Sequence, residues 1–514
     1  MSLKTIQRTA GYAGLAASAL SVRRATSARA RSSAQDHLCQ RLGRLHGLPQ
    51  KVGQMLSFTS NPEKLDAAEA FAPLQESAEP LPWPTIARIL AAAWGRPVLE
   101  VLAEVDTKGH AASLGQVHQA RLLDGTEVAI KVQYPGIRQA VQTDLKALGW
   151  LSLPLGNLRR GFDLEAYRLV IGSCLATELD YQQEAAQQDA MGRDWEADEA
   201  VIVPRVVQEL SDETVLVTQW ESGDHWTEVP AAWSPGERRR LANTLLRFFL
   251  QGLFHHGRMQ ADWHPGNFRF RRNGGNPQVV VYDFGCLVRP EPRQRLLLAR
   301  LIRATVQQDE SPWPLMRELG FQENWLQPLA GKLPAVCRLL LEPFCTRRPY
   351  DLHDWKLAER MEAVLADDRW NFRFAGPPGL VFVLRAFHGV IHYLQGTGEP
   401  IDWHAAVQET LAPLQSQIEN LAVTAGEPVV ACTSVATWLR VRVVREGRTQ
   451  VQLSQPAMGI ERLEELLDDE LKQRILLAGI DLQKSVEAVR SRGYAPGPVF
   501  ELVDEEKEVR VWLE

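Results

Sequence analysis

The sequence predicts an α+β fold of two lobes, a small lobe rich in strands followed by a larger lobe built of helices. Hydrophobic residues alternate with period two between residues 105 and 133, whereas helical periodicity dominates after Glu221-Ser222-Gly223. A chain of 514 residues also exceeds what one hydrophobic core usually holds, so two or three domains are expected. Changes of periodicity place boundaries at residues 104 and 222, and the link Gly426-Glu427-Pro428 places a third at residue 424.

Residues 1–104 are expected to form a basic N-terminal segment and a helical extension. Residues 85–102 show helical periodicity after a proline-rich break, and leucines recur earlier at helical intervals: Leu38, Leu42, Leu45 and Leu48. The uncharged run from Thr9 to Val22 has 14 residues, fewer than the roughly 20 that a membrane-spanning helix needs. We interpret the basic segment as a frayed or helical terminus, with a membrane-surface anchor as the alternative.

The small lobe, residues 105–222, should begin with a hairpin that turns at Asp124-Gly125. Strand and helix patterns then alternate. The expected elements are strands at Val117 to Leu123 and Glu127 to Val132, a helix from Leu164 to Trp195, and strands at Val201 to Val207 and Thr214 to Trp220.

The large lobe, residues 223–424, should be helical apart from a hairpin at Phe268 to Tyr282. Residues 425–514 read as a separate small α+β module. Its expected elements are a hairpin of Thr437 to Val444 and Thr449 to Leu453 turning at Glu446-Gly447, helices at 459–477 and 482–492, and a second hairpin within Val499 to Glu514.

Charge and cysteine content narrow the functional classes. The net charge of -6 gives no reason to expect a nucleic-acid binder. Scattered cysteines without a Cys-x-x-Cys pair favour a reduced, cytoplasmic compartment and predict neither a zinc site nor a disulfide framework. The six are Cys39, Cys174, Cys286, Cys337, Cys345 and Cys432.

Lys131 ends the alternating strand Val128-Ala129-Ile130-Lys131 and emerges on the face opposite Val128 and Ile130. A nucleotide site needs a cation of this kind to neutralise phosphates, and a carboxylate to aim it. The candidate carboxylates are Glu184 and Glu178, on one predicted helix. Taken alone, Lys131 would be interpreted as a solvated surface lysine.

Two downstream motifs change that interpretation. Asp262 and Asn267 have the spacing at which an acid orients an attacking hydroxyl and an amide oxygen binds Mg²⁺. The apolar strand Val279 to Tyr282 then delivers Asp283, in Asp283-Phe284-Gly285, to the same metal. In this order the motifs predict a protein-kinase-like fold that holds a metal-bound nucleotide. His264 is expected to pack against the loop or cap it.

An alanine-rich segment, Ala111-Ala112-Ser113-Leu114-Gly115-Gln116-Val117-His118, stands where a glycine-rich loop is expected. Glycines let backbone N–H groups approach phosphates closely, and each alanine adds a Cβ and restricts the backbone. The hypothesis is a stiffer loop with slow or tightly gated phosphoryl transfer.

The combined motifs resemble the UbiB (AarF, coenzyme-Q-kinase-like) atypical kinase family over about residues 35 to 400. The similar strings are the alanine-rich segment, Val-Ala-Ile-Lys-Val-Gln-Tyr-Pro-Gly, Glu178-Leu179-Asp180 with Glu184, Ala-Asp-x-His-Pro-Gly-Asn, and Lys51-Val52-Gly53-Gln54. His110, Gln187, Gln260 and Trp263 depart from the family pattern, and Trp263 is expected to narrow the site.

The resemblance implies a role for each matching residue. Lys131 would contact phosphates and pair with Glu184, Asp262 would be the catalytic base, and Asn267 and Asp283 would hold Mg²⁺. The resemblance further implies nucleotide contacts by Ala111, Ala112, Ser113, Gly115 and Gln116, an adenine hinge at Gln219 to Glu221, and a cover formed by Lys51 and Gln54 with Glu178 and Asp180.

The implied activity is Mg²⁺-dependent ATP binding with ATP hydrolysis or phosphoryl transfer to a small or lipid-like acceptor, linked to ubiquinone or isoprenoid-lipid metabolism. One alternative is a Ser/Thr protein kinase, against which the Lys-x-Gly-Gln string and the lack of an Ala-Pro-Glu segment argue. Another is a weakly catalytic nucleotide-binding regulatory module. Peripheral contact with the inner membrane and homodimer formation stay open.

Overall fold

A computed structural model describes residues 80–514 except 113, 140, 142–176, 369–371, 373–374, 425–435, 446–447, 468, 479, 492–493, 495 and 504–506. Three predicted site residues, Lys51, Gln54 and Ser113, lie outside the described residues, as do the helices expected before residue 80. No helix in the described part of the chain is long and apolar enough to cross a membrane.

The small lobe is a five-stranded antiparallel sheet of order β1-β3-β4-β6, with β2 paired to β3. Alternation in β4 buries Val128, Ile130 and Val132 completely and turns Lys131 to the opposite face. The strands are β1 (Leu102–Val105), β2 (His110–Ala111), β3 (Gly115–Leu122), β4 (Glu127–Gln133) and β6 (Val215–Gln219).

Helix α5 (Trp83–Trp94) covers the apolar face of this sheet through Ile86 and Leu90. The expected helix over residues 85–102 is wrong in its second half. Gly95 adopts φ 65°, a left-handed conformation that ends the helix at low cost, and β1 follows at Leu102.

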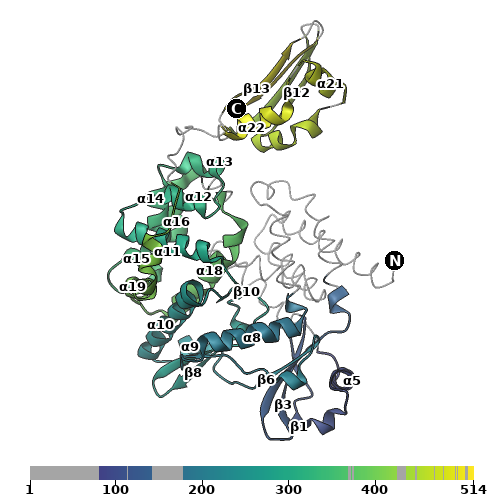
Figure 1. Cartoon of the computed structure of the whole chain (residues 1–514), viewed down its shortest axis with the longest axis vertical. Coiled ribbons are helices and arrows are strands. Elements are labelled where there is room, and N and C mark those ends of the chain that lie inside the picture. The colour runs from purple at the N-terminus through teal and green to yellow at the C-terminus, as the bar shows by residue number, and fades with distance from the viewer. Residues whose placement is uncertain are drawn as a thin grey trace, which may run out of the picture.

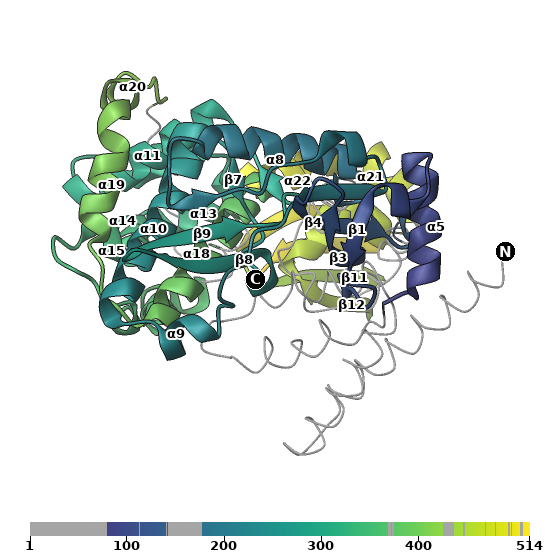
Figure 2. The same cartoon turned by 90° about the horizontal axis from the view of Figure 1, so that it is seen from below.

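Helix α8 (Tyr181–Trp195) lies beside β6 and runs toward the large lobe (Figures 1 and 2). Its start is fixed by Asp180, whose carboxylate accepts from the backbone N–H groups of Gln182 and Gln183 at 3.1 and 3.3 Å. The predicted helix ends at Trp195 as expected, but it is not continuous. Asp180 has an extended backbone and starts a new helix, so Glu178 lies before α8 and not on it. Residues 164–176 of the predicted helix fall outside the described residues.

A three-stranded sheet of order β5-β9-β8 joins the large lobe to the end of α8. The expected strand over residues 201–207 is reduced to β5 (Val201–Ile202), because Pro204 offers no N–H for a ladder. The predicted hairpin at Phe268 to Tyr282 is confirmed as β8 (Phe268–Asn273) and β9 (Asn276–Val281). A second short pair joins β7 (Met259–Gln260) to β10 (Leu287–Val288).

The large lobe is helical, as predicted, around an extended apolar core and a second, smaller apolar cluster. Helix α10 (Pro235–Gln251) begins at a capping box of Ser234 and Glu237 and packs against α18 (Val381–Thr397). The other helices are α9 (Glu228–Ala232), α11 (Pro292–Gln307), α12 (Pro312–Glu318), α13 (Glu323–Leu326), α14 (Leu333–Leu340), α15 (Glu342–Cys345), α16 (Leu357–Leu365), α19 (Trp403–Leu411) and α20 (Gln415–Glu419).

The C-terminal module has its own core and a four-stranded antiparallel sheet of order β12-β11-β14-β13. Figure 1 shows it at the end of the large lobe away from the small lobe. The Tyr494 ring stacks on Trp325 of α13, with centroids 5.3 Å apart. Its elements are β11 (Trp438–Arg445), β12 (Arg448–Pro456), a 3₁₀ helix (Ala457–Leu466), α21 (Asp469–Leu477), α22 (Leu482–Ser491), β13 (Gly497–Val503) and β14 (Lys507–Leu513).

Candidate active site

Lys131 and Glu184 form an ion pair between β4 and α8. The Lys131 Nζ donates to both carboxylate oxygens of Glu184, at 2.7 and 2.9 Å. Glu184 is completely buried, whereas Lys131 keeps 22% of its side chain exposed and lies 4.9 Å from the Tyr181 ring centroid. Of the two candidate partners, Glu184 is therefore the one that pairs with Lys131.

The pKa values of this pair reflect burial and crowding by acids. Burial alone would lower the pKa of Lys131, but the carboxylates of Glu184 and Asp283 outweigh it and raise that pKa above its usual value. Burial raises the pKa of Glu184 to about 7, against the opposing effect of Lys131. A lysine held charged in this way is suited to bind phosphate.

Asp283 follows β9 and lies within ion-pair reach of Lys131, with Oδ2 4.0 Å from Nζ. Its other oxygen, Oδ1, accepts from the Gly285 N–H at 2.9 Å. Phe284 is fully buried in the core of the large lobe, which anchors the segment. The two lobes thus meet at Lys131, Glu184 and Asp283.

The loop after β7 carries Asp262 and Asn267. The Asn267 amide nitrogen donates to the Asp262 carbonyl at 3.2 Å, the orientation that leaves an amide oxygen to serve as a metal ligand. Carboxylate and amide oxygens are the ligand types that Mg²⁺ prefers, so Asn267 with Asp283 fits that ion chemically. Within the described residues, no group of three or more His, Cys, Asp or Glu forms a ready-made metal cage.

Gln260 connects this loop to Asp283. Its side-chain oxygen accepts from the Asp262 N–H at 3.0 Å, and its side-chain nitrogen donates to the Asp283 carbonyl. The sequence marked Gln260 only as a departure from the family pattern. The only signal in the sequence was an amide side chain two residues before Asp262. The role of Gln260 is to hold the Asp262 loop and the Asp283 segment in register.

Trp263 does not narrow the site, contrary to expectation. The indole is only 2% exposed, stacks on Phe268 at 5.2 Å, and donates to the Gln260 carbonyl at 2.9 Å. A Cβ at Gly389 would come within 2.3 Å of Trp263, so α18 lies directly against it. Trp263 therefore anchors the loop to the large-lobe core.

Arg385 of α18 pairs with Asp262, a contact the sequence reasoning missed. The distance is 2.7 Å, and the exposed side-chain fractions are 9% for Arg385 and 3% for Asp262. The two residues are 123 positions apart. Because α18 is an ordinary helix with no motif around this arginine, no local signal marked it.

Glu178 and Asp180 lie at the entry to α8 with different contacts. Glu178 is 5% exposed and packs on the Asp283 segment, since a Cβ on Gly285 would stand 2.4 Å from its Cγ. Asp180 is the N-cap of α8 and also accepts from the Gln183 side chain at 3.1 Å. The structure thus brings Glu178 to the site and places Asp180 at its edge as a helix cap.

The alanine-rich segment begins in β2 and ends in β3. Ala111 and Ala112 are half-buried, and the Ala112 N–H donates to the Gly115 carbonyl at 2.8 Å. A Cβ on Gly115 would meet the Val132 carbonyl at 2.2 Å, so glycine is required there for the close approach of β3 to β4. The packing of β3 against β4 therefore explains the glycine at position 115 without any contact to a nucleotide.

The expected nucleotide contact by Gln116 is wrong. Gln116 pairs with Val132 in register and so lies on the sheet face opposite Lys131. It is fully buried, and its amide binds the backbone N–H and carbonyl of Leu81 at 2.7 and 3.2 Å. Gln116 instead fastens the segment before α5 to the sheet.

The expected hinge, Gln219 to Glu221, links the lobes. Gln219 ends β6 opposite Val128, and the Glu221 carbonyl accepts from the Tyr282 hydroxyl. The Glu221 carboxylate pairs with Arg271 at 2.5 Å. Tyr282 directly precedes Asp283, so one side chain ties the hinge to the metal-ligand candidate; burial raises the pKa of its hydroxyl to about 12.

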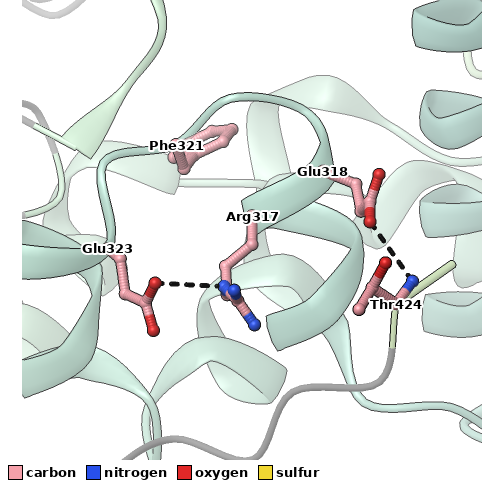
Figure 3. A pocket seen from close by; sticks show the side chains of 5 residues that line it. All are labelled: Arg317, Glu318, Phe321, Glu323 and Thr424. Carbon is pink, nitrogen blue, oxygen red and sulfur yellow. Dashed lines mark hydrogen bonds and ion pairs between the residues drawn. The ribbon is translucent and has the colours of Figure 1, made fainter.

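A separate hollow of about 340 Å³ lies near the end of the large lobe, and Figure 3 shows its lining. Arg317 pairs with Glu323 at 3.3 Å, and Glu318 accepts from the Thr424 N–H at 3.2 Å. None of the predicted site residues lines it. Each of its charged groups already has a partner, since Glu318 also pairs with Arg293 at 2.6 Å, so the hollow does not compete with the inter-lobe site as the candidate.

Comparison with known proteins agrees with this geometry. Residues 73–313 match the family model of the ABC1 atypical kinase-like domain. The chain is 30% identical over 313 residues to a probable protein kinase UbiB of Marinobacter nauticus, covering 59% of this chain and 56% of that protein. It is 29% identical over 378 residues to a probable protein kinase UbiB of Xylella fastidiosa, covering 72% of this chain and 66% of that protein.

Among solved structures, a Mycobacterium tuberculosis protein, Rv3197, determined in complex with erythromycin, superposes with a TM-score of 0.51. Its sequence is 25% identical, and the match covers 74% of this chain and 96% of that one. The chain thus spans between about half and two thirds of the curated relatives given above, and nearly all of the solved structure.

Proposed function

Since the chain belongs to the ABC1, UbiB-like atypical kinase family, we propose that it binds Mg²⁺-ATP between its lobes and transfers or hydrolyses the γ-phosphate. The observation that carries this proposal is the meeting of Lys131, Glu184 and Asp283 at 2.7 to 4.0 Å, from three separate elements. This cluster combines a charged lysine for phosphates with an acid for the metal, as phosphoryl transfer requires.

In the proposed mechanism Lys131 binds the α- and β-phosphates and Glu184 keeps it aimed. Asp262 accepts the proton of the attacking hydroxyl, and Gln260 holds that acid in register with Asp283. Asn267 and Asp283 would hold Mg²⁺, which neutralises charge on the transferring phosphoryl group. Ala111 and Ala112 would cover the phosphates, and Gln219 to Glu221 would receive the adenine.

We also propose that the acceptor is a small or lipid-like molecule linked to ubiquinone or isoprenoid-lipid metabolism, in a cytoplasmic protein that touches the inner membrane peripherally. This rests on the family resemblance and on the expected cover formed by Lys51 and Gln54 with Glu178 and Asp180. The alternatives remain a Ser/Thr protein kinase and a weakly catalytic regulatory module. Phosphate release should be measured with and without lipid extract. An increase with lipid indicates an enzyme that lipid stimulates, whereas no increase favours a regulatory module.

Nucleotide binding is tested by thermal unfolding with and without Mg²⁺-ATP. A ligand that binds only the native state raises Tm by mass action. We expect a rise in the parent, retained in Asp354→Asn, an exposed aspartate of the large lobe, and largely lost in Asp283→Asn. Absence of any rise in the parent at millimolar nucleotide would refute the proposed function.

A further inference from the structure

Asp262 lies in a loop that supplies no permanent positive charge of its own. Between Asp262 and Asn267 the chain reads Trp263-His264-Pro265-Gly266, without lysine or arginine. The His264 side chain accepts from the Gly266 N–H at 3.0 Å and serves as the cap of this turn. A charge that fixes the Asp262 carboxylate must therefore come from outside the loop.

Arg385 supplies that charge from α18. Its Nη2 lies 2.7 Å from Asp262 Oδ1, and both side chains are more than nine-tenths buried. A carboxylate and a guanidinium removed from water in this way are held together firmly, because separating them would leave each charge uncompensated. The backbone of the same helix is fixed against Trp263 at Gly389, so helix and loop form one rigid unit.

We propose that Arg385 is a positioning residue for the phosphoryl-transfer step, acting through Asp262. It holds one carboxylate oxygen so that the acid keeps a single orientation toward the acceptor hydroxyl. In that step the hydroxyl oxygen forms a bond to the γ-phosphorus while the bond from that phosphorus to the β,γ-bridging oxygen breaks. The hydroxyl proton passes to Asp262, and the electron pair of the broken bond leaves on ADP.

This inference rests on the proposed function and deepens it by assigning the residue that prepares the base. The alternative is a purely structural ion pair that tethers α18. A matched control for tethering is Arg238 of α10, which pairs with Glu399 just after α18 at 2.8 Å and donates to the Thr397 carbonyl at 2.9 Å. Arg238 touches none of the site residues.

The test compares phosphate release from Mg²⁺-ATP, with water as acceptor, in the full chain and its variants. We expect Arg385→Gln to lower kcat by about 10- to 100-fold, part of what a positioned general base contributes, while the Mg²⁺-ATP-induced Tm rise is kept. Arg385→Lys should recover only part of this, because an ammonium cannot reproduce the guanidinium geometry. Arg238→Gln should retain the parent kcat.

The decisive readout is the double variant. If Arg385 acts through Asp262, Asp262→Asn with Arg385→Gln should be no slower than Asp262→Asn alone. The double variant places two neutral side chains at these positions and leaves no buried unpaired charge. It can therefore be measured even if Arg385→Gln alone folds poorly.

Three outcomes would overturn the inference. They are additive losses in the double variant, equal effects of Arg385→Gln and Arg238→Gln, and faster turnover in Arg385→Gln, which would make the pair autoinhibitory. A parent that binds no nucleotide refutes the proposed function itself, and a parent that binds but releases no phosphate refutes the transfer step. If the parent protein binds nucleotide and releases phosphate, the three outcomes above refute the role of Arg385 and leave the proposed function intact.

Discussion

The Lys131–Glu184 pair of the small lobe and the Arg385–Asp262 pair of the large lobe have the same shortest distance, 2.7 Å, but different exposure. In the small lobe the acid, Glu184, is completely buried and the lysine is 22% exposed, so the pair presents its cation outward. In the large lobe both Asp262 and Arg385 are below 10% exposure. Under the proposed function the first pair would meet phosphates directly, whereas the second would hold the Asp262 carboxylate in one orientation.

This difference predicts how each pair responds when it is broken. A buried pair that loses one partner leaves an uncompensated charge, which is costly, whereas replacing both partners with apolar residues costs far less. Variants of Glu184 should therefore affect stability and nucleotide binding together. Variants of Arg385 should also cost stability, because they leave the buried Asp262 carboxylate uncompensated, and they should lower turnover while nucleotide binding is kept.

The largest effect is expected for Glu184→Ala. Loss of the carboxylate leaves Lys131 without its closest partner, and we expect the free energy of unfolding to fall by about 3–5 kcal/mol, with the Mg²⁺-ATP-induced Tm rise abolished. Chemical denaturation measures the first quantity. The double variant Lys131→Met, Glu184→Leu should recover most of the stability without any binding; an equally unstable double variant would contradict the account.

Gly285→Ala should come next. Its Cβ would stand 2.4 Å from Glu178 Cγ and 3.3 Å from Asp283 Oδ1, so the segment must shift. Such overpacking costs about 1–3 kcal/mol and should weaken Mg²⁺-nucleotide binding. Gly331→Ala, where a Cβ meets nothing within 4 Å, is the control and should leave binding unchanged. Equal Mg²⁺-nucleotide binding by the two variants would mean that the Asp283 segment does not contact the nucleotide.

A smaller effect is expected when Ala111 and Ala112 are both replaced by glycine. Added backbone freedom costs about 0.5–1 kcal/mol per residue, while closer approach of the loop to phosphates should change the ratio of ATP to ADP affinity. Calorimetric titration of both nucleotides measures this ratio. The matched change at the exposed residues Ala231 and Ala232 of α9 should leave it constant; identical ratios in all three proteins would remove the loop from the phosphate site.

The smallest effect is expected at the junction with the C-terminal module. Trp325→Leu keeps an apolar side chain in its cluster but removes the face that stacks on Tyr494, a contact of about 0.5–1.5 kcal/mol. Faster proteolytic separation of the module, with unchanged nucleotide binding, would match this role. Unchanged proteolysis would mean that the stack does not secure the module.

The sequence predicted those parts of the site that local patterns of neighbouring residues indicate. Strand alternation placed Lys131 on the correct face, and an apolar strand ending in acid located Asp283. Gln116 was wrongly expected to contact the nucleotide, because it belongs to the alanine-rich motif. Strand alternation places its side chain on the sheet face opposite Lys131. Arg385 could not be found, because its pairing depends on how α18 packs against the loop 123 residues earlier.

The central claim is that one Mg²⁺-nucleotide complex joins the two lobes at Lys131, Asn267 and Asp283. A crystal structure with Mg²⁺ and a non-hydrolysable ATP analogue tests it most directly. The account predicts the metal at about 2.0–2.1 Å from an oxygen of Asn267 and of Asp283, with phosphates on Lys131. Nucleotide bound elsewhere, for example in the hollow beside Arg317, or metal that contacts neither residue, would contradict it.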